Sequence, residues 1–92
     1  MVLASEIKDL NVYSKDMVNL GKVKDLEFDS SEMKVTNVIV EFQKEAAKDL
    51  LGKKIVFRHA RGRVPVSSIE SLKDALNLKL PREELKDKFK GL

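Results

Sequence analysis

The segment from residue 34 to residue 42 most strongly limits how this chain can fold. Val38, Val40 and Phe42 recur at every second position, which is the period of a strand with one buried face. Val38, Ile39 and Val40 are also three consecutive β-branched residues, and such residues lose side-chain freedom in a helix. We therefore predict a strand here, and the rest of the fold must supply strands that pair with it.

Five further segments are predicted to be shorter strands. Gly21 stands just before the second of them, where it supplies a bulge or a positive φ, and Leu26 and Phe28 share one face of that strand. Together with the first segment they make six strands, which is a mainly β domain. The five segments are residues 11–13, 22–29, 54–59, 63–66 and 76–80.

A hairpin is predicted in the second half of the chain. Residues 54–59 and 63–66 are separated by residues 60–62, which include a glycine, and this spacing is typical of a hairpin with glycine in its turn. Pro65 places the returning strand at an edge of the sheet or at a bulge, because proline cannot donate a hydrogen bond to a neighbouring strand.

Short helical segments are predicted between the strands. Single turns are expected at residues 5–10, with Ser5 as the cap, and at residues 67–72, where a serine and a glutamate have capping-box spacing. Residues 43–51 change to helical spacing and end before Gly52, which predicts a short linking helix.

A terminal helix is predicted from residue 81 to residue 91. Pro81 stands at its start, glutamates lie in the first turn, lysines lie towards the end, and Gly91 stops it. Leu85 and Phe89 lie four residues apart, so one apolar stripe is expected to dock on the sheet or on another subunit. This divides the chain into a β domain at residues 1–80 and a C-terminal helix at residues 81–92.

Composition limits the kind of protein. The 92 residues support one hydrophobic core, with 42% hydrophobic and 36% charged residues. The absence of cysteine excludes disulfides, thiolate metal sites and a cysteine nucleophile, and it favours a reducing cytoplasm. No apolar run approaches the roughly 20 residues of a membrane-spanning helix, so no membrane insertion is expected.

Charge is unevenly distributed along the chain. Residues 1–51 carry 7 basic and 10 acidic side chains, whereas residues 52–92 carry 11 and 5. The asymmetry indicates an acidic partner for the second half or self-association of opposed halves, although a small charged surface is also often lopsided by chance.

A basic segment is the best functional candidate in this sequence. No acidic residue lies between its ends, and the predicted hairpin concentrates its last four members at the tip. Arginine donates paired hydrogen bonds to carboxylate or phosphate, so an acidic protein and nucleic acid are both open as targets, beside a solvated hairpin whose charges only prevent edge pairing. The predicted partner-binding residues are Lys53, Lys54, Arg58, His59, Arg61, Arg63 and, on the terminal stripe, Leu85 and Phe89.

Other polar groups give weaker signals. Asp25, Glu27 and Asp29 share one face of a strand, and either bind a cation, dock a basic partner, or simply form the solvated face. Tyr13 is free enough to stack on a base, since Phe28, Phe42 and Phe57 fit inward strand positions, but it is also interpreted as a rim residue with its hydroxyl in water. A single histidine between arginines supplies no catalytic triad or zinc site, so we expect no enzyme, cofactor or metal.

Several short stretches resemble PRC-barrel domains. Residues 12–16, 20–23 and 26–29 (Val-Tyr-Ser-Lys-Asp, Leu-Gly-Lys-Val and Leu-Glu-Phe-Asp) are similar to the family's opening hairpin, and residues 64–72 to its closing segment. The resemblance covers about residues 3–80. Met17 departs from it, because the family usually has glycine there.

This resemblance implies a small six-stranded β-barrel of the compact archaeal, stand-alone type, used as an adaptor and not as a catalyst. The family occurs in a photosynthetic reaction-centre subunit, a ribosome-maturation factor and small archaeal proteins, some tied to cell division. We therefore expect a non-enzymatic cytoplasmic adaptor that binds an acidic protein surface or a second copy of itself as a homodimer, in archaeal cell division. The alternative is an RNA- or ribosome-associated module that uses the basic hairpin.

Overall fold

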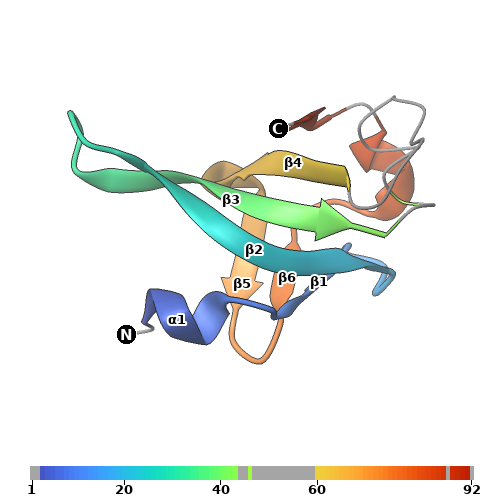
Figure 1. Ribbon diagram of the computed structural model, residues 1–92. Coiled ribbons are helices and arrows are strands. Elements are labelled where there is room, and N and C mark those ends of the chain that lie inside the picture. Colours follow the sequence, from blue (N-terminus) through green and yellow to red (C-terminus); the bar gives the residue numbers. More distant parts are fainter. Residues whose placement is uncertain (1–2, 44–45, 47–59, 87, 92) are drawn as a thin grey trace.

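The computed structural model describes residues 3–43, 46, 60–86 and 88–91. Strands dominate these residues, and α1, η1 and η2 are each about a single turn (Figure 1). The first helix begins at Ala4, so Ser5 lies inside it and not at its cap. In chain order the elements are α1 (Ala4–Ile7), β1 (Asn11–Tyr13), β2 (Asn19–Asp29), β3 (Lys34–Phe42), β4 (Ala60–Pro65), the 3₁₀ turn η1 (Val66–Ser68), β5 (Ile69–Leu72), β6 (Leu76–Leu78), the 3₁₀ turn η2 (Arg82–Leu85) and β7 (Lys90–Gly91).

All the strands described by the structure belong to one mixed sheet. Its order is β5-β6-β1-β2-β3-β4-β7, with β1 and β6 parallel and the other neighbours antiparallel. The sheet bends so that β5 and β6 cross behind β2 and β3 (Figure 1). In the described residues no pairing joins β5 to the opposite edge, so the prediction of a closed six-stranded barrel is corrected to an open, bent sheet whose seventh strand has two residues.

The two longest strands, β2 and β3, form the centre of the sheet. The alternating residues of β3 pair with β2 from Gly21↔Phe42 to Asp29↔Lys34, and the strand prediction for this segment is confirmed. Gly21 has a φ of 156°, and a Cβ placed on it would lie 2.1 Å from the carbonyl oxygen of Glu41. Glycine is therefore required because the backbones approach too closely for any side chain.

Two irregularities in the β2–β3 pairing change what each strand exposes. One extra residue lies on β2 between Val23 and Asp25, and a second lies on β3 opposite the step from Glu27 to Phe28. Such bulges bend and twist a hairpin. Figure 1 shows the connection between the two strands projecting beyond the rest of the sheet.

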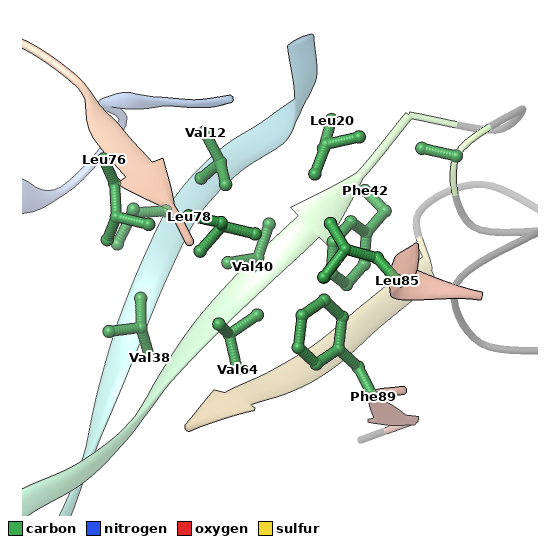
Figure 2. Close-up of a cluster of buried hydrophobic side chains, with 12 residues drawn as sticks. Val12, Leu20, Val38, Val40, Phe42, Val64, Leu76, Leu78, Leu85 and Phe89 are labelled. Atoms are coloured by element: carbon green, nitrogen blue, oxygen red, sulfur yellow. The ribbon is translucent and has the colours of Figure 1, made fainter. Parts of the chain in front are cut away.

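One core lies on the concave side of the bent sheet. Figure 2 shows side chains from β1, β2, β3, β4 and β6 meeting there, together with two residues from the end of the chain. The fully or nearly buried members are Val12, Leu20, Val23, Val38, Val40, Phe42, Ala46, Val64, Leu76, Leu78, Leu85 and Phe89. They are predominantly aliphatic, as expected for a chain without tryptophan.

The end of the chain corrects the prediction of a terminal helix. The helical turn stops at Leu85, because Lys86 adopts a ψ of 128°, and residues 90–91 then pair with β4. The ring of Phe89 stacks on that of Phe42, with centroids 6.0 Å apart and an angle of 11° between the planes. Core packing of Phe89 and pairing with β4 thus override the local helical signals.

Two further predictions were wrong in the segment after residue 59. Residues 60–62 are not a turn but the first half of β4, paired with β3 from Phe42↔Ala60 to Asn37↔Pro65. Residues 67–72 are not a helical turn, since η1 gives way at Ile69 to β5, which pairs with β6. The predicted linking helix at 43–51 and the strand at 54–59 lie outside the described residues, except for Ala46 and residue 43.

A small polar cluster ties the β1–β2 turn to the C-terminal segment. The buried Ser14 hydroxyl donates a hydrogen bond to Asp16, and the backbone N–H of Arg82 donates to the same carboxylate at 3.1 Å. These bonds lower the pKa of Asp16, the Ser14 hydroxyl having the largest effect. Met17, in the same turn, has a φ of 66° and is 67% exposed.

Candidate functional site

The sheet has a charged outer face opposite the core, formed by β2, β3 and β4. Arg61 and Arg63 alternate along β4 and lie opposite Glu41 and Ile39 of β3. Ile39 is only 3% exposed although it is absent from the core cluster, so it is buried on the outer face. We call this surface, with Glu27 of β2, the outer face.

The two arginines of the outer face are paired within the chain. Arg63 Nε donates to Glu27 Oε1 and Oε2 at 2.9 and 3.0 Å, and Asn37 donates to Glu27 Oε1 at 3.0 Å. Arg61 Nε lies 3.4 Å from Glu41 Oε1, and its side chain is 47% exposed. The arginines therefore remain accessible, but carboxylates of the same chain already offset part of their charge.

A third ion pair lies at the edge of this surface. Lys24 Nζ contacts Asp9 Oδ1 at 2.8 Å. Their hydrogen bond is the main reason that the pKa of Asp9 is lowered and that of Lys24 raised. It joins β2 to the segment that follows α1.

The structure separates the predicted site residues. Arg61 and Arg63 lie on the outer face, in β4 and not at a hairpin tip. Leu85 and Phe89 are 2% and 5% exposed and belong to the core of the same chain. The remaining predicted residues, Lys53, Lys54, Arg58 and His59, lie outside the described residues.

The acidic stripe of β2 has local structural roles. Asp25 Oδ1 accepts the N–H of Leu26 at 2.8 Å, and Glu27 binds Arg63. Asp29 caps the β2–β3 turn by accepting bonds from Ser31 and from the N–H of Glu32, chiefly the Ser31 hydroxyl, and these lower its pKa. In the described part of the chain, no group of three or more acidic, histidine or cysteine side chains is placed to hold a metal ion.

Phe28 is the surface residue that sequence reasoning misplaced. It leaves β2 on the same side as Leu26, because the extra residue between their pairing positions lies on β3. Leu26 packs against the core, but Phe28 stands further along the projecting hairpin and is 56% exposed. The alternating sequence pattern predicted correctly which face of β2 carries Phe28. It could not predict where along β2 the core ends.

A mostly apolar groove lies beside β2. It has a volume of about 260 Å³ and separates α1 from the middle of β2. Its lining residues are Ala4, Ser5, Ile7, Lys8, Val23, Lys24, Asp25 and Leu26. The groove is large enough for one sizeable apolar side chain.

Comparison with known proteins identifies the family. The sequence model of the PRC-barrel domain family matches residues 1–85 of this 92-residue chain. The chain belongs to the PRC-barrel family. PRC-barrel domains are in general binding or scaffold domains and not catalysts. No curated protein matches this PRC-barrel chain.

The structure describes the conformation of the Met17 turn, where the sequence resemblance led us to expect glycine. The left-handed φ of 66° at Met17 is a conformation that glycine adopts without steric cost. Among the helices placed by the structure, none has the length and apolar character needed to cross a membrane.

Proposed function

We propose that this PRC-barrel protein is a non-enzymatic adaptor that binds an acidic protein surface through the basic part of its second half. The family match over residues 1–85 carries the proposal of a binding role. The absence of cysteine is the basis for placing this role in the reducing cytoplasm. Resemblance to small archaeal family members is the basis for proposing a role in cell division.

The outer face supports a charged partner. Arg61 is about half exposed, and its guanidinium has a 3.4 Å contact with Glu41 that a partner carboxylate can replace or share. Arg63 is held more firmly by Glu27, so we assign it a smaller share of binding. Lys53, Lys54, Arg58 and His59 lie outside the described residues and remain predicted partner-binding residues.

Affinity capture tests this proposal. The immobilised chain is compared with a variant in which Arg58, Arg61 and Arg63 are replaced by alanine, and the retained proteins are identified. A matched control replaces three other basic residues with alanine, namely the exposed Lys73, Lys79 and Lys86. Loss of a discrete protein with the arginine variant alone supports the proposal; equal retention by all three chains contradicts it.

RNA is the alternative target, because arginines also bind phosphate. The exposed aromatic Phe28 does not favour it, since Asp25, Glu27 and Asp29 lie in the same strand and repel a phosphate backbone. Five or six phosphate contacts would give a log-log salt slope of roughly −4 for single strands. Binding of single-stranded RNA with that slope would replace the acidic protein as the target.

Self-association is the other arrangement within the proposal. Opposed net charges in the two halves would let one copy bind another, and such binding weakens with salt. Light scattering at two salt concentrations distinguishes self-association from binding of a separate protein. A dimer that dissociates at high salt supports pairing of the two halves. A monomer at both salt concentrations contradicts self-association, and a separate acidic protein is then the proposed partner.

A further inference from the structure

Strand β2 has an open edge beyond Val23. β1 pairs with β2 only as far as Lys22, and the next backbone contacts are Asp9 and Leu10 with Val23, at 2.8 and 2.9 Å. Past that point, no described residue pairs with β2 on the side away from β3. A strand edge of this kind accepts another extended segment through main-chain hydrogen bonds.

Leu26 and Phe28 direct their backbone polar groups to this open edge. The N–H of Leu26 donates a local hydrogen bond to Oδ1 of the neighbouring Asp25, at 2.8 Å. Phe28 lies two residues further along the same strand and therefore presents the same edge. An incoming carbonyl can replace the local Asp25 bond without leaving a donor unsatisfied.

Apolar surface lines the core side of this edge. The groove between α1 and β2 includes Ile7, Val23 and Leu26, and the 56% exposed Phe28 continues it towards the hairpin end. Met33, beyond the end of β2, is 73% exposed. Every second side chain of an added strand would point to this side, so alternate residues of the occupant must be apolar.

The other side of the same edge is acidic. Asp25 and Asp29 leave β2 on the outer side with Glu27 between them, and among the described residues an arginine, Arg63, offsets Glu27 alone. Side chains of an added strand that point to this side therefore lie beside carboxylates. Basic residues satisfy those carboxylates, whereas acidic residues are repelled.

We propose that the edge of β2 from Leu26 to Phe28 binds an extended peptide segment of a partner protein, in which apolar and basic side chains alternate. Main-chain hydrogen bonds pair the peptide with β2. The groove binds one apolar side chain of the peptide, and Phe28 packs on the next apolar side chain. Asp25 and Asp29 select the basic positions. This surface is distinct from the basic outer face at Arg61, so binding here does not depend on the adaptor proposal above.

A second copy of the chain fits this edge poorly. Antiparallel pairing of two β2 edges, with Leu26 of each copy opposite Phe28 of the other, places Glu27 opposite Glu27. The same register places Asp25 opposite Asp29. Like charges directly opposite each other destabilise a strand pair. The charge pattern therefore favours a basic occupant over an identical strand.

Selection from a random nonapeptide library displayed on phage tests the proposal with the full chain as bait. The expected consensus alternates Leu, Ile, Val or Phe with Lys or Arg. A synthetic peptide of that consensus should bind Phe28→Ser at least about tenfold more weakly than the unmodified chain. Met17→Ser, which alters another exposed apolar residue, in the β1–β2 turn, should leave the affinity unchanged.

Two further measurements separate edge pairing from simple apolar contact. N-methylation of the peptide at the residues that face β2 should abolish binding, because it removes the main-chain donors. Asp25→Asn, which keeps an acceptor for the Leu26 N–H but removes the charge, should weaken binding severalfold at low salt and little at high salt. Unfolding curves confirm that these exposed substitutions leave the fold intact.

Three results would overturn the proposal. The first is a selection that yields no consensus or one without basic and apolar alternation. The second is an affinity that Phe28→Ser or backbone N-methylation leaves unchanged. The third is a concentration-dependent dimer that Phe28→Ser abolishes, which would assign the edge to a second copy. None of these results bears on capture through the arginines of the outer face.

Discussion

Arg63 Nε lies 2.9 Å from Glu27 Oε1 and 3.0 Å from Oε2, across a surface that also buries Ile39. The two side chains are 39% and 34% exposed, so water screens their attraction. The pair joins β4 to β2 over the intervening β3 strand. It fixes one predicted binding residue in place and reduces the charge available to an acidic partner.

A double-mutant cycle measures this pair. Replacing Glu27 with Gln, Arg63 with Ala, and both together should give a coupling free energy of about 0.2 to 1 kcal/mol in urea unfolding, because the pair is half exposed. The coupling should fall with added salt. A coupling that is zero at low salt would show that the contact contributes nothing to stability.

Gly21 should be intolerant of any side chain. A Cβ there meets the Glu41 carbonyl oxygen at 2.1 Å, in a φ region that other residues rarely adopt, so Gly21→Ala should destabilise the fold by about 2 kcal/mol or more. Lys22→Ala, at the exposed next position, is the control and should change stability by less than about 0.5 kcal/mol. Similar unfolding midpoints for the two variants would refute the close approach of β2 and β3.

Met17→Gly should stabilise the protein. The residue holds a φ of 66° and its side chain is 67% exposed, so glycine relieves backbone strain and sacrifices little packing. The expected gain is about 0.5 to 1 kcal/mol after the entropic cost of glycine. Lys15→Gly, in the same turn but with negative φ, should lower the melting temperature. If both variants are less stable than the unmodified chain, the positive φ of Met17 does not strain the backbone.

Asp16 should contribute to acid sensitivity. Its bonds from Ser14 and Arg82 lower the folded pKa below the ordinary 3.8, so its stabilising contribution is present above that value and is lost as the pH falls through the folded pKa. Asp16→Asn should therefore be less stable than the unmodified chain at neutral pH and show a weaker decline of urea midpoint on acidification. Parallel pH curves for the two chains would contradict this assignment; Asp9 and Asp29 retain their own dependence in both.

Sequence reasoning succeeded where local pattern and tertiary pairing agree. The alternating residues of β3 are buried as the period required, and the positive φ expected at Gly21 is present, although Gly21 lies inside β2 and not before it. The PRC-barrel resemblance over short stretches of β1 and β2 was confirmed by the family match. In these elements the same residues specify both the strand and its buried face.

It failed where tertiary contacts decide the conformation. The helical signals after Pro81 are real for one turn, but Phe89 stacks on Phe42 and residues 90–91 pair with β4. Gly62 suggested a turn, yet it lies opposite Val40 inside a strand pair. No local pattern reports that Glu27 is the partner of Arg63, 36 residues away. Site residues that depend on such contacts require the three-dimensional structure.

The central claim, that the outer face binds an acidic partner protein, is tested most directly by titrating the captured partner into the unmodified chain and into Arg61→Glu. Reversal of this half-exposed charge should weaken binding by about tenfold or more and reduce its salt dependence. Lys79→Glu, an equal charge change at an exposed position outside β4, should leave the affinity nearly unchanged. Equal affinities for the unmodified chain and Arg61→Glu would contradict the claim.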